Sequence, residues 1–148
     1  MYDETMTYSI ALRFVLPLLL LTAACNGSSD TVLDDVGLAC AEGIADAALP
    51  VTVDFQSCLS SSCDHLQSAE CTVTLDGTTL TVEATATIHH PDNPTNTCTA
   101  DCGSAFAECE TPILAEGTYT LVYGDQSTEL VVPTDAPADA EPTCVEAR

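Results

Sequence analysis

Nine cysteines in a chain of 148 residues limit its possible folds more than any other feature. Cysteines at this density in a small chain are typical of a disulfide framework, which persists in an oxidising compartment. The alternative is a thiolate metal site, because Cys58–Cys63 and Cys98–Cys102 are closely spaced, but the tight cysteine spacing of zinc knuckles is absent. We therefore expect disulfides. Since nine is an odd number, one cysteine must have a different role.

Residues 1–24 have the pattern of a signal peptide. The apolar run 14–24 follows Arg13 and is shorter than the roughly 20 residues that a membrane-spanning helix needs. Small residues end it directly before Cys25. Two alternatives stay open, which are an ordinary secretory peptide cut after Ala24 and an uncleaved apolar helix. Two acidic residues lie in the first five positions, where a signal peptide carries positive charge, so we predict that translation begins at Met6 rather than Met1.

The segment Leu21-Thr22-Ala23-Ala24-Cys25 resembles the processing site of bacterial lipoproteins, in which a leucine and two small residues precede the cysteine. The leucine lies one place earlier here than is usual in that family. The resemblance implies cleavage before Cys25, a diacylglyceryl thioether on its sulfur and acylation of the new amino terminus. Two or more acyl chains hold a protein firmly at a membrane. In that family Asn26, as the residue after the cysteine, implies the outer membrane or the cell surface.

Lipid on Cys25 would leave an even number of cysteines for disulfides. We expect Cys40 to pair with Cys144, which would join the two ends of the domain, and Cys71 with Cys109, which would join two strands. The remaining pairings stay open. The eight predicted disulfide cysteines are Cys40, Cys58, Cys63, Cys71, Cys98, Cys102, Cys109 and Cys144.

The charge of the chain excludes several partners. It has 23 Asp and Glu against two Arg and no Lys, for a net charge of −21. Without a basic cluster to release counterions, nucleic acid is not an expected partner. Anionic lipid would also repel the surface, so membrane attachment would depend on the lipid anchor. The chain has three Phe, four Tyr and no Trp, which predicts a thin core that needs cross-links.

Alternation of apolar residues with threonine predicts β-strands. Residues 71–75 and 80–88 alternate on both sides of Asp76-Gly77, the strongest short signal for an antiparallel hairpin. A second hairpin is predicted from 117–123 and 127–132, with further strands at 51–55 and 105–110 and a helical turn or two within 31–49. The fold prediction is a small, all-β antiparallel β-sandwich stapled by disulfides.

The predicted layout is a signal peptide at 1–24, a lipidated tether at 25–37 and a single domain at 38–148 that ends in a Pro/Ala/Asp-rich tail. Residues 114–133 resemble the last two strands of immunoglobulin-like sandwiches in bacterial envelope proteins, through the unit Gly117-Thr118-Tyr119. The whole chain also resembles small cysteine-rich lipoproteins of myxobacterial type. This resemblance implies an immunoglobulin-like domain and no particular activity.

No group of residues points to catalysis or to a cofactor. The Gly-x-Ser-x-Gly frame is absent, and so is a glycine-rich phosphate loop. His65 beside Asp64 could serve as a base, but the sequence assembles no triad around it. We therefore expect that the protein is not an enzyme.

Two adjacent histidines, His89 and His90, are the only candidate metal ligands that stand out. Neighbouring residues in a strand point to opposite faces, so both could bind one ion only if the backbone turned at Pro91. His65 or Asp92 could add a ligand. The alternative is a pair of exposed loop histidines. The loop with Asp92, Asn93, Asn96 and Asp101 is rich in oxygen atoms but lacks the spacing of an EF-hand.

The expected function is that of a lipid-anchored, monomeric envelope module with a structural or interaction role. The alternative is a lipoprotein that binds a metal or small ligand through His89, His90 and the Asp92 loop. An inhibitor of a secreted enzyme is a third hypothesis, for which no reactive loop can be singled out.

Overall fold

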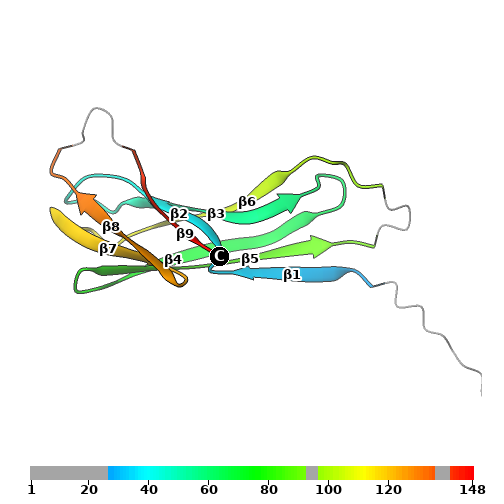
Figure 1. Ribbon diagram of the computed structural model, residues 1–148, viewed down its shortest axis with the longest axis horizontal. Coiled ribbons are helices and arrows are strands. Elements are labelled where there is room, and N and C mark those ends of the chain that lie inside the picture. The colour runs from blue at the N-terminus through cyan, green and yellow to red at the C-terminus, as the bar shows by residue number, and fades with distance from the viewer. Residues whose placement is uncertain (1–26, 93–96, 136–140) are drawn as a thin grey trace, which may run out of the picture.

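The structure is a computed structural model of the chain, and it describes residues 27–92, 97–135 and 141–148. These residues form nine strands and no helix, and therefore none that could cross a membrane. Figure 1 shows the strands in two layers. The strands are β1 (Ser29–Asp34), β2 (Gly37–Ala41), β3 (Pro50–Leu59), β4 (His65–Asp76), β5 (Thr79–His90), β6 (Gly103–Glu110), β7 (Gly117–Tyr123), β8 (Gln126–Val132) and β9 (Thr143–Ala147).

The five-stranded sheet, sheet A, is built around the long predicted hairpin β4–β5. One edge of β5 pairs with β4 along its length. The other edge is shared, because β1 pairs with residues 85–90 and β7 pairs with residues 79–82. β8 then pairs with β7, as the second predicted hairpin requires. The β5–β7 pair is parallel, which corrects the prediction of a wholly antiparallel fold, because β6 lies between them in the chain and belongs to the other sheet.

The four-stranded sheet, sheet B, has the order β6-β3-β2-β9, and all its pairs are antiparallel. β9 occupies residues that were predicted to belong to the Pro/Ala/Asp-rich tail. The resemblance of residues 114–133 to the last two strands of a sandwich therefore does not match the chain order, since β9 follows them. The predicted helical turns within 31–49 are wrong, because β1 and β2 lie there. β1 also lies within the predicted tether, of which residues 29–34 are part of sheet A.

The chain crosses from sheet A to sheet B between β1 and β2. Gly37 makes this crossing possible, with a φ of 109° and so little space that a Cβ atom would lie 2.2 Å from the Asp54 carbonyl oxygen. Asp35 fills the corner, where its carboxylate accepts a hydrogen bond of 2.7 Å from the backbone N–H of Ala84. The Tyr123 hydroxyl donates to the Val36 carbonyl at 2.8 Å. Both bonds hold the segment between β1 and β2 against sheet A.

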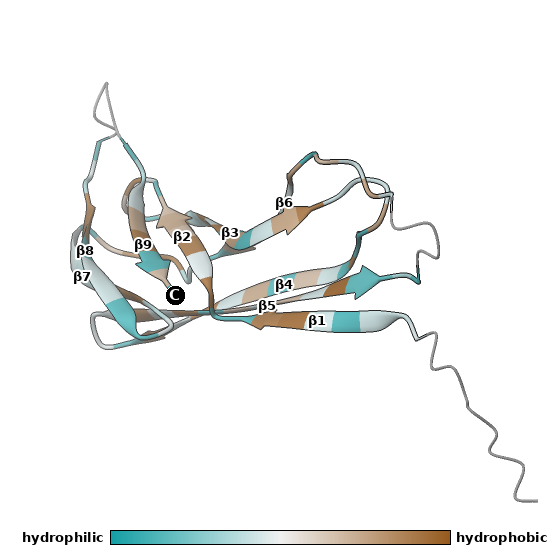
Figure 2. Cartoon of the chain, turned by 45° about the vertical axis from the view of Figure 1, so that its right-hand side comes forward, coloured by the Kyte–Doolittle hydropathy of each residue, from teal (hydrophilic) through white to brown (hydrophobic). Residues whose placement is uncertain are grey.

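The core lies between the sheets and is formed by the apolar side of each alternating strand, as the hydropathy colouring along the strands illustrates (Figure 2). Phe55 and Tyr123 are the largest fully buried side chains. Much of the remaining core is small, as the sequence predicted. Its alanines are Ala39, Ala41, Ala45, Ala84, Ala86, Ala105, Ala107 and Ala147.

Four disulfides pair all eight cysteines of the described residues. Both predicted pairs are confirmed. Cys40–Cys144 joins neighbouring strands β2 and β9, and Cys71–Cys109 joins β4 of sheet A to β6 of sheet B. The pairs left open are Cys58–Cys102 and Cys63–Cys98, which both join the region around the β3–β4 loop to the segment before β6. A framework this dense is expected to supply much of the stability that the small core lacks.

Candidate functional site

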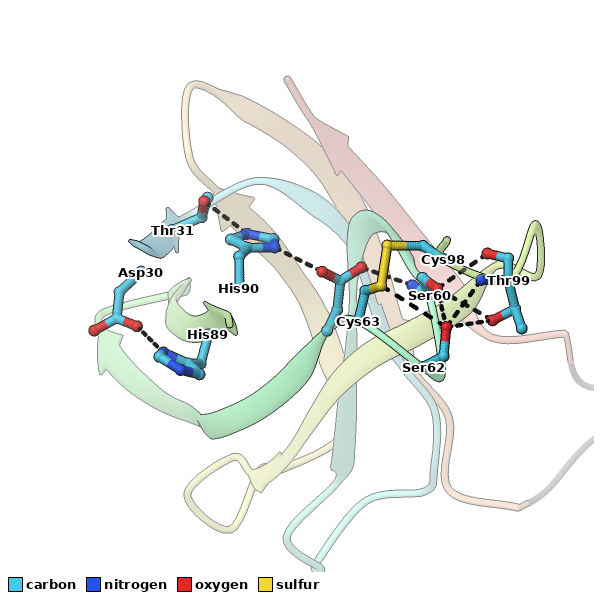
Figure 3. A network of polar contacts seen from close by, with 10 residues as sticks. Asp30, Thr31, Ser60, Ser62, Cys63, His89, His90, Cys98 and Thr99 are labelled. Carbon is cyan, nitrogen blue, oxygen red and sulfur yellow. Dashed lines mark hydrogen bonds and ion pairs between the residues drawn. A yellow bond between two sulfur atoms is a disulfide. The ribbon is translucent and has the colours of Figure 1, made fainter. Parts of the chain in front are cut away.

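Polar side chains gather where β5 ends, β1 begins and β3 turns into β4 (Figure 3). His89 and His90 are the last two residues of β5 and do not lie in a loop, which corrects the prediction of loop histidines. Because the strand alternates, His90 lies on the same side as buried Ile88, and His89 lies on the outer side of sheet A. The two histidines therefore face different surroundings, as the sequence argument predicted for neighbouring strand residues.

His90 is the centre of a hydrogen-bonded chain that we call the His90 network, formed by Thr31, His90, Asp64 and Ser60. His90 Nδ1 lies 2.7 Å from Asp64 Oδ1, and His90 Nε2 lies 3.0 Å from the Thr31 hydroxyl. The backbone N–H of Ser60 donates to Asp64 Oδ2 at 2.7 Å. This bond from Ser60, followed by the bond to His90, lowers the pKa of Asp64 below its ordinary value.

Hydroxyl groups extend the His90 network toward the segment before β6. The Ser60 hydroxyl donates to the Thr99 carbonyl at 3.0 Å, and the Thr99 backbone N–H donates to the Ser62 hydroxyl at 2.9 Å. Hydrogen bonds from Ser61 and Thr99 lower the pKa of Asp101 to about 2. Two disulfides, Cys58–Cys102 and Cys63–Cys98, join the same two segments, so the loops are fixed both covalently and by hydrogen bonds.

The order carboxylate, imidazole, hydroxyl in Asp64, His90 and Thr31 matches the arrangement that activates a nucleophile in serine hydrolases. The sequence suggested His65 as a base beside Asp64, but the imidazole that hydrogen-bonds to Asp64 is that of His90. The Thr31 hydroxyl has His90 as its side-chain partner among the described residues. These contacts are sufficient to tie β1, β5 and the β3–β4 loop together.

His89 contacts a different carboxylate on the outer side of sheet A. Its Nδ1 atom lies 2.6 Å from Asp30 Oδ1, and the Gln67 amide donates to the same oxygen at 3.4 Å. Asp92 is described, but it is not among the hydrogen-bond partners of either histidine. Hence the structure does not bring His89, His90 and Asp92 together. Within residues 27–92, 97–135 and 141–148, no three His, Cys, Asp or Glu side chains are already grouped around a possible metal position.

Two predicted features lie outside the described residues. One is Cys25 with its signal peptide, and the other is the pair Asn93 and Asn96 in the oxygen-rich loop. The described parts define the protein by class, as a two-sheet, all-β domain with four disulfides and an ordered polar end. Comparison of the chain with known protein families, with characterised proteins and with solved structures finds no match.

Proposed function

We propose that the protein is a lipid-anchored extracytoplasmic module with a structural or interaction role and no catalytic activity. The observation that carries this proposal is the complete pairing of the eight cysteines within the described residues, which leaves Cys25 as the one cysteine outside the framework. Structural disulfides persist in oxidising compartments. A ninth cysteine directly after a signal-peptide pattern is the position at which bacterial lipoproteins carry their lipid.

The start of β1 supports a short tether. Ser29 is already paired with His90, so only residues 26–28 separate Cys25 from sheet A. Even a fully extended chain would then keep the lipidated sulfur within about 15 Å of the sheet. In this proposal the His90 network lies close to the membrane surface, and the β4–β5 turn at Asp76-Gly77 lies at the other end of that hairpin (Figure 1). The outer membrane or the cell surface is the proposed location.

An interaction role agrees with a rigid domain. In this proposal the two sheets form an immunoglobulin-like sandwich, an architecture that hosts many unrelated roles. Loops that are stapled and hydrogen-bonded at the polar end lose little entropy when a partner binds. The acidic surface would disfavour association between copies of the chain, and we propose a monomer.

The test is to compare the parent chain with a Cys25→Ser variant in a bacterial host that receives labelled palmitate. We expect label on the parent protein and its recovery with membranes, and neither for the variant. Ser28→Ala serves as the control, because it changes the tether and keeps the sulfur. If Cys25→Ser leaves fractionation unchanged, or if the parent carries no label, the anchor is disproved. Eight free thiols in the intact mass of the protein purified from these cells would contradict the extracytoplasmic location.

A further inference from the structure

Three polar residues form one row across the outer face of sheet A. His65 on β4 lies directly opposite His89 on β5, and Asp30 on β1 lies opposite His89 on the other side. Side chains of directly opposite residues share a face, and their Cβ atoms lie about 4.5–5.5 Å apart. Two imidazoles are therefore held as neighbours by the register of a rigid hairpin, with a carboxylate next to one of them.

The contact between His89 and Asp30 fixes which nitrogen of His89 can bind a metal. An ionised carboxylate only accepts hydrogen bonds, so the proton must lie on Nδ1, which is 2.6 Å from Asp30 Oδ1. The neutral ring then carries its lone pair on Nε2. Metal-binding histidines commonly have this arrangement, in which a carboxylate behind the ring sets its tautomer and orientation. The Gln67 amide, which donates to the same oxygen of Asp30, restrains the carboxylate in turn.

His65 is available as the second ligand. Its side chain is exposed, and the structure gives it no hydrogen bond among the described residues. Its electrostatic interaction with Asp64 is not a hydrogen bond, so a turn of the ring toward His89 breaks no hydrogen bond. Imidazole nitrogen suits Cu²⁺, Ni²⁺ and Zn²⁺ better than Ca²⁺ or Mg²⁺. The net charge of −21 would raise the local concentration of any divalent cation.

We propose that His65 and His89 form a two-histidine site for Zn²⁺, Cu²⁺ or Ni²⁺, in which Asp30 orients His89 and water completes the coordination. Two protein ligands are consistent with the absence of a preformed group of three among the described residues. The site differs from the grouping of His89, His90 and Asp92 considered from the sequence. It does not depend on the lipid anchor or on the proposed interaction role.

The experiment is a calorimetric titration of the disulfide-bonded chain with Zn²⁺ in an excess of Ca²⁺, which occupies isolated surface carboxylates. The chain carries Cys25→Ser, so that the ninth cysteine cannot bind the metal. We expect one saturable site. His65→Ala and His89→Ala should each lower the affinity by at least about tenfold, and Asp30→Ala by about 10–100-fold, as is typical for loss of a carboxylate behind a ligand.

His90→Ala is the matched control, because it removes the neighbouring imidazole on the opposite side of the strand. It should keep the parent affinity. Chemical shifts of the histidine ring protons provide a second measurement, in which Zn²⁺ should move the signals of His65 and His89 but not that of His90. The proposal is overturned if no saturable site is found, if Ca²⁺ abolishes it, if His65→Ala binds like the parent, or if His90→Ala loses as much affinity as His89→Ala.

Discussion

The connectivity of the disulfides predicts that Cys40–Cys144 stabilises the fold more than Cys58–Cys102. In the unfolded chain, a disulfide lowers the conformational entropy of the ring that it closes. The size of that ring depends on the other three disulfides, which stay intact. With Cys58–Cys102 intact, Cys40–Cys144 closes a route through residues 40–58 and 102–144, a ring of about 60 residues. With Cys63–Cys98 intact, Cys58–Cys102 closes a ring of only about eleven residues, through 58–63 and 98–102.

Loop-closure entropy converts these ring sizes into stability. The larger ring corresponds to about 4.3 kcal/mol at 25 °C and the smaller ring to about 2.8 kcal/mol. Cys40→Ala with Cys144→Ala should therefore lower the free energy of unfolding by about 1.5 kcal/mol more than Cys58→Ala with Cys102→Ala. Cys58 and Cys102 are exposed, so their replacement leaves no cavity that would add to the smaller cost.

Urea unfolding under non-reducing conditions measures both losses, with Cys25→Ser in every protein. The comparison must use the extrapolated free energy rather than the midpoint, because opening a ring expands the unfolded chain and raises the slope of the transition. Equal losses, or a larger loss for the Cys58–Cys102 pair, would refute the chain-entropy argument. Strain or native-state contacts would then dominate the contribution of these disulfides.

Three further predictions concern the crossing between the sheets and the His90 network. Burial, with smaller effects of nearby carboxylates, raises the pKa of Tyr123 to about 12 from an ordinary 10.0. The stability that its neutral phenol contributes is therefore complete below pH 10 and lost as the pH rises through 12. The urea midpoint of the parent should fall across this window, and that of Tyr123→Phe should fall less. Equal falls would contradict this prediction. Gly37→Ala should lower the free energy of unfolding, measured by thermal unfolding, by about 3 kcal/mol or more, because its φ is positive and the space is closed. Gly77→Ala has a positive φ but open space and should lower it by about 1–2 kcal/mol. Similar losses for the two variants would contradict the steric argument. Hydrolysis of p-nitrophenyl acetate by the parent should not exceed that by Thr31→Ala or His90→Ala, and turnover that both variants abolish would contradict the non-catalytic proposal.

Local pattern was sufficient to predict the longer strands, and it failed for the short ones. The hairpins β4–β5 and β7–β8 alternate over many residues on both sides of a turn, so their pairing is local. β1, β2 and β9 are five or six residues long. β1 and β9 pair with strands that are distant in sequence, and β2 begins at Gly37, where the chain crosses between the sheets. Their stability comes from tertiary pairing, which periodicity cannot indicate. The parity of the cysteines predicted how many disulfides form, but two of the four pairings depended on where the loops meet.

The His90 network was beyond prediction for the same reason. Asp64 and His90 are 26 residues apart, and they meet only because the β3–β4 loop folds over the end of β5. Alternation did predict that His89 and His90 point to opposite sides, which is a property of any strand. It could not predict the carboxylate that each would meet, because Asp30 reaches His89 through the pairing of β1 with β5.

The position of His65 depends on a single extra residue in β4. The register from Asp76–Thr79 to Ser68–Thr87 is regular, and if it continued, Gln67 would lie opposite Ile88 and His65 would lie opposite His90. The bulge after Leu66 places an apolar side chain opposite Ile88 instead and moves His65 opposite His89. Leu66 remains 42% exposed in this position, so the preference for the bulge comes from covering part of an apolar side chain rather than from sparing a buried amide. Deletion of Gln67 should therefore keep Leu66 opposite Ile88 and His65 opposite His89. The Zn²⁺ affinity should fall only slightly, because Asp30 loses the hydrogen bond from the Gln67 amide. If the deletion abolishes Zn²⁺ binding while the fold and disulfides remain, register alone does not create the two-histidine site.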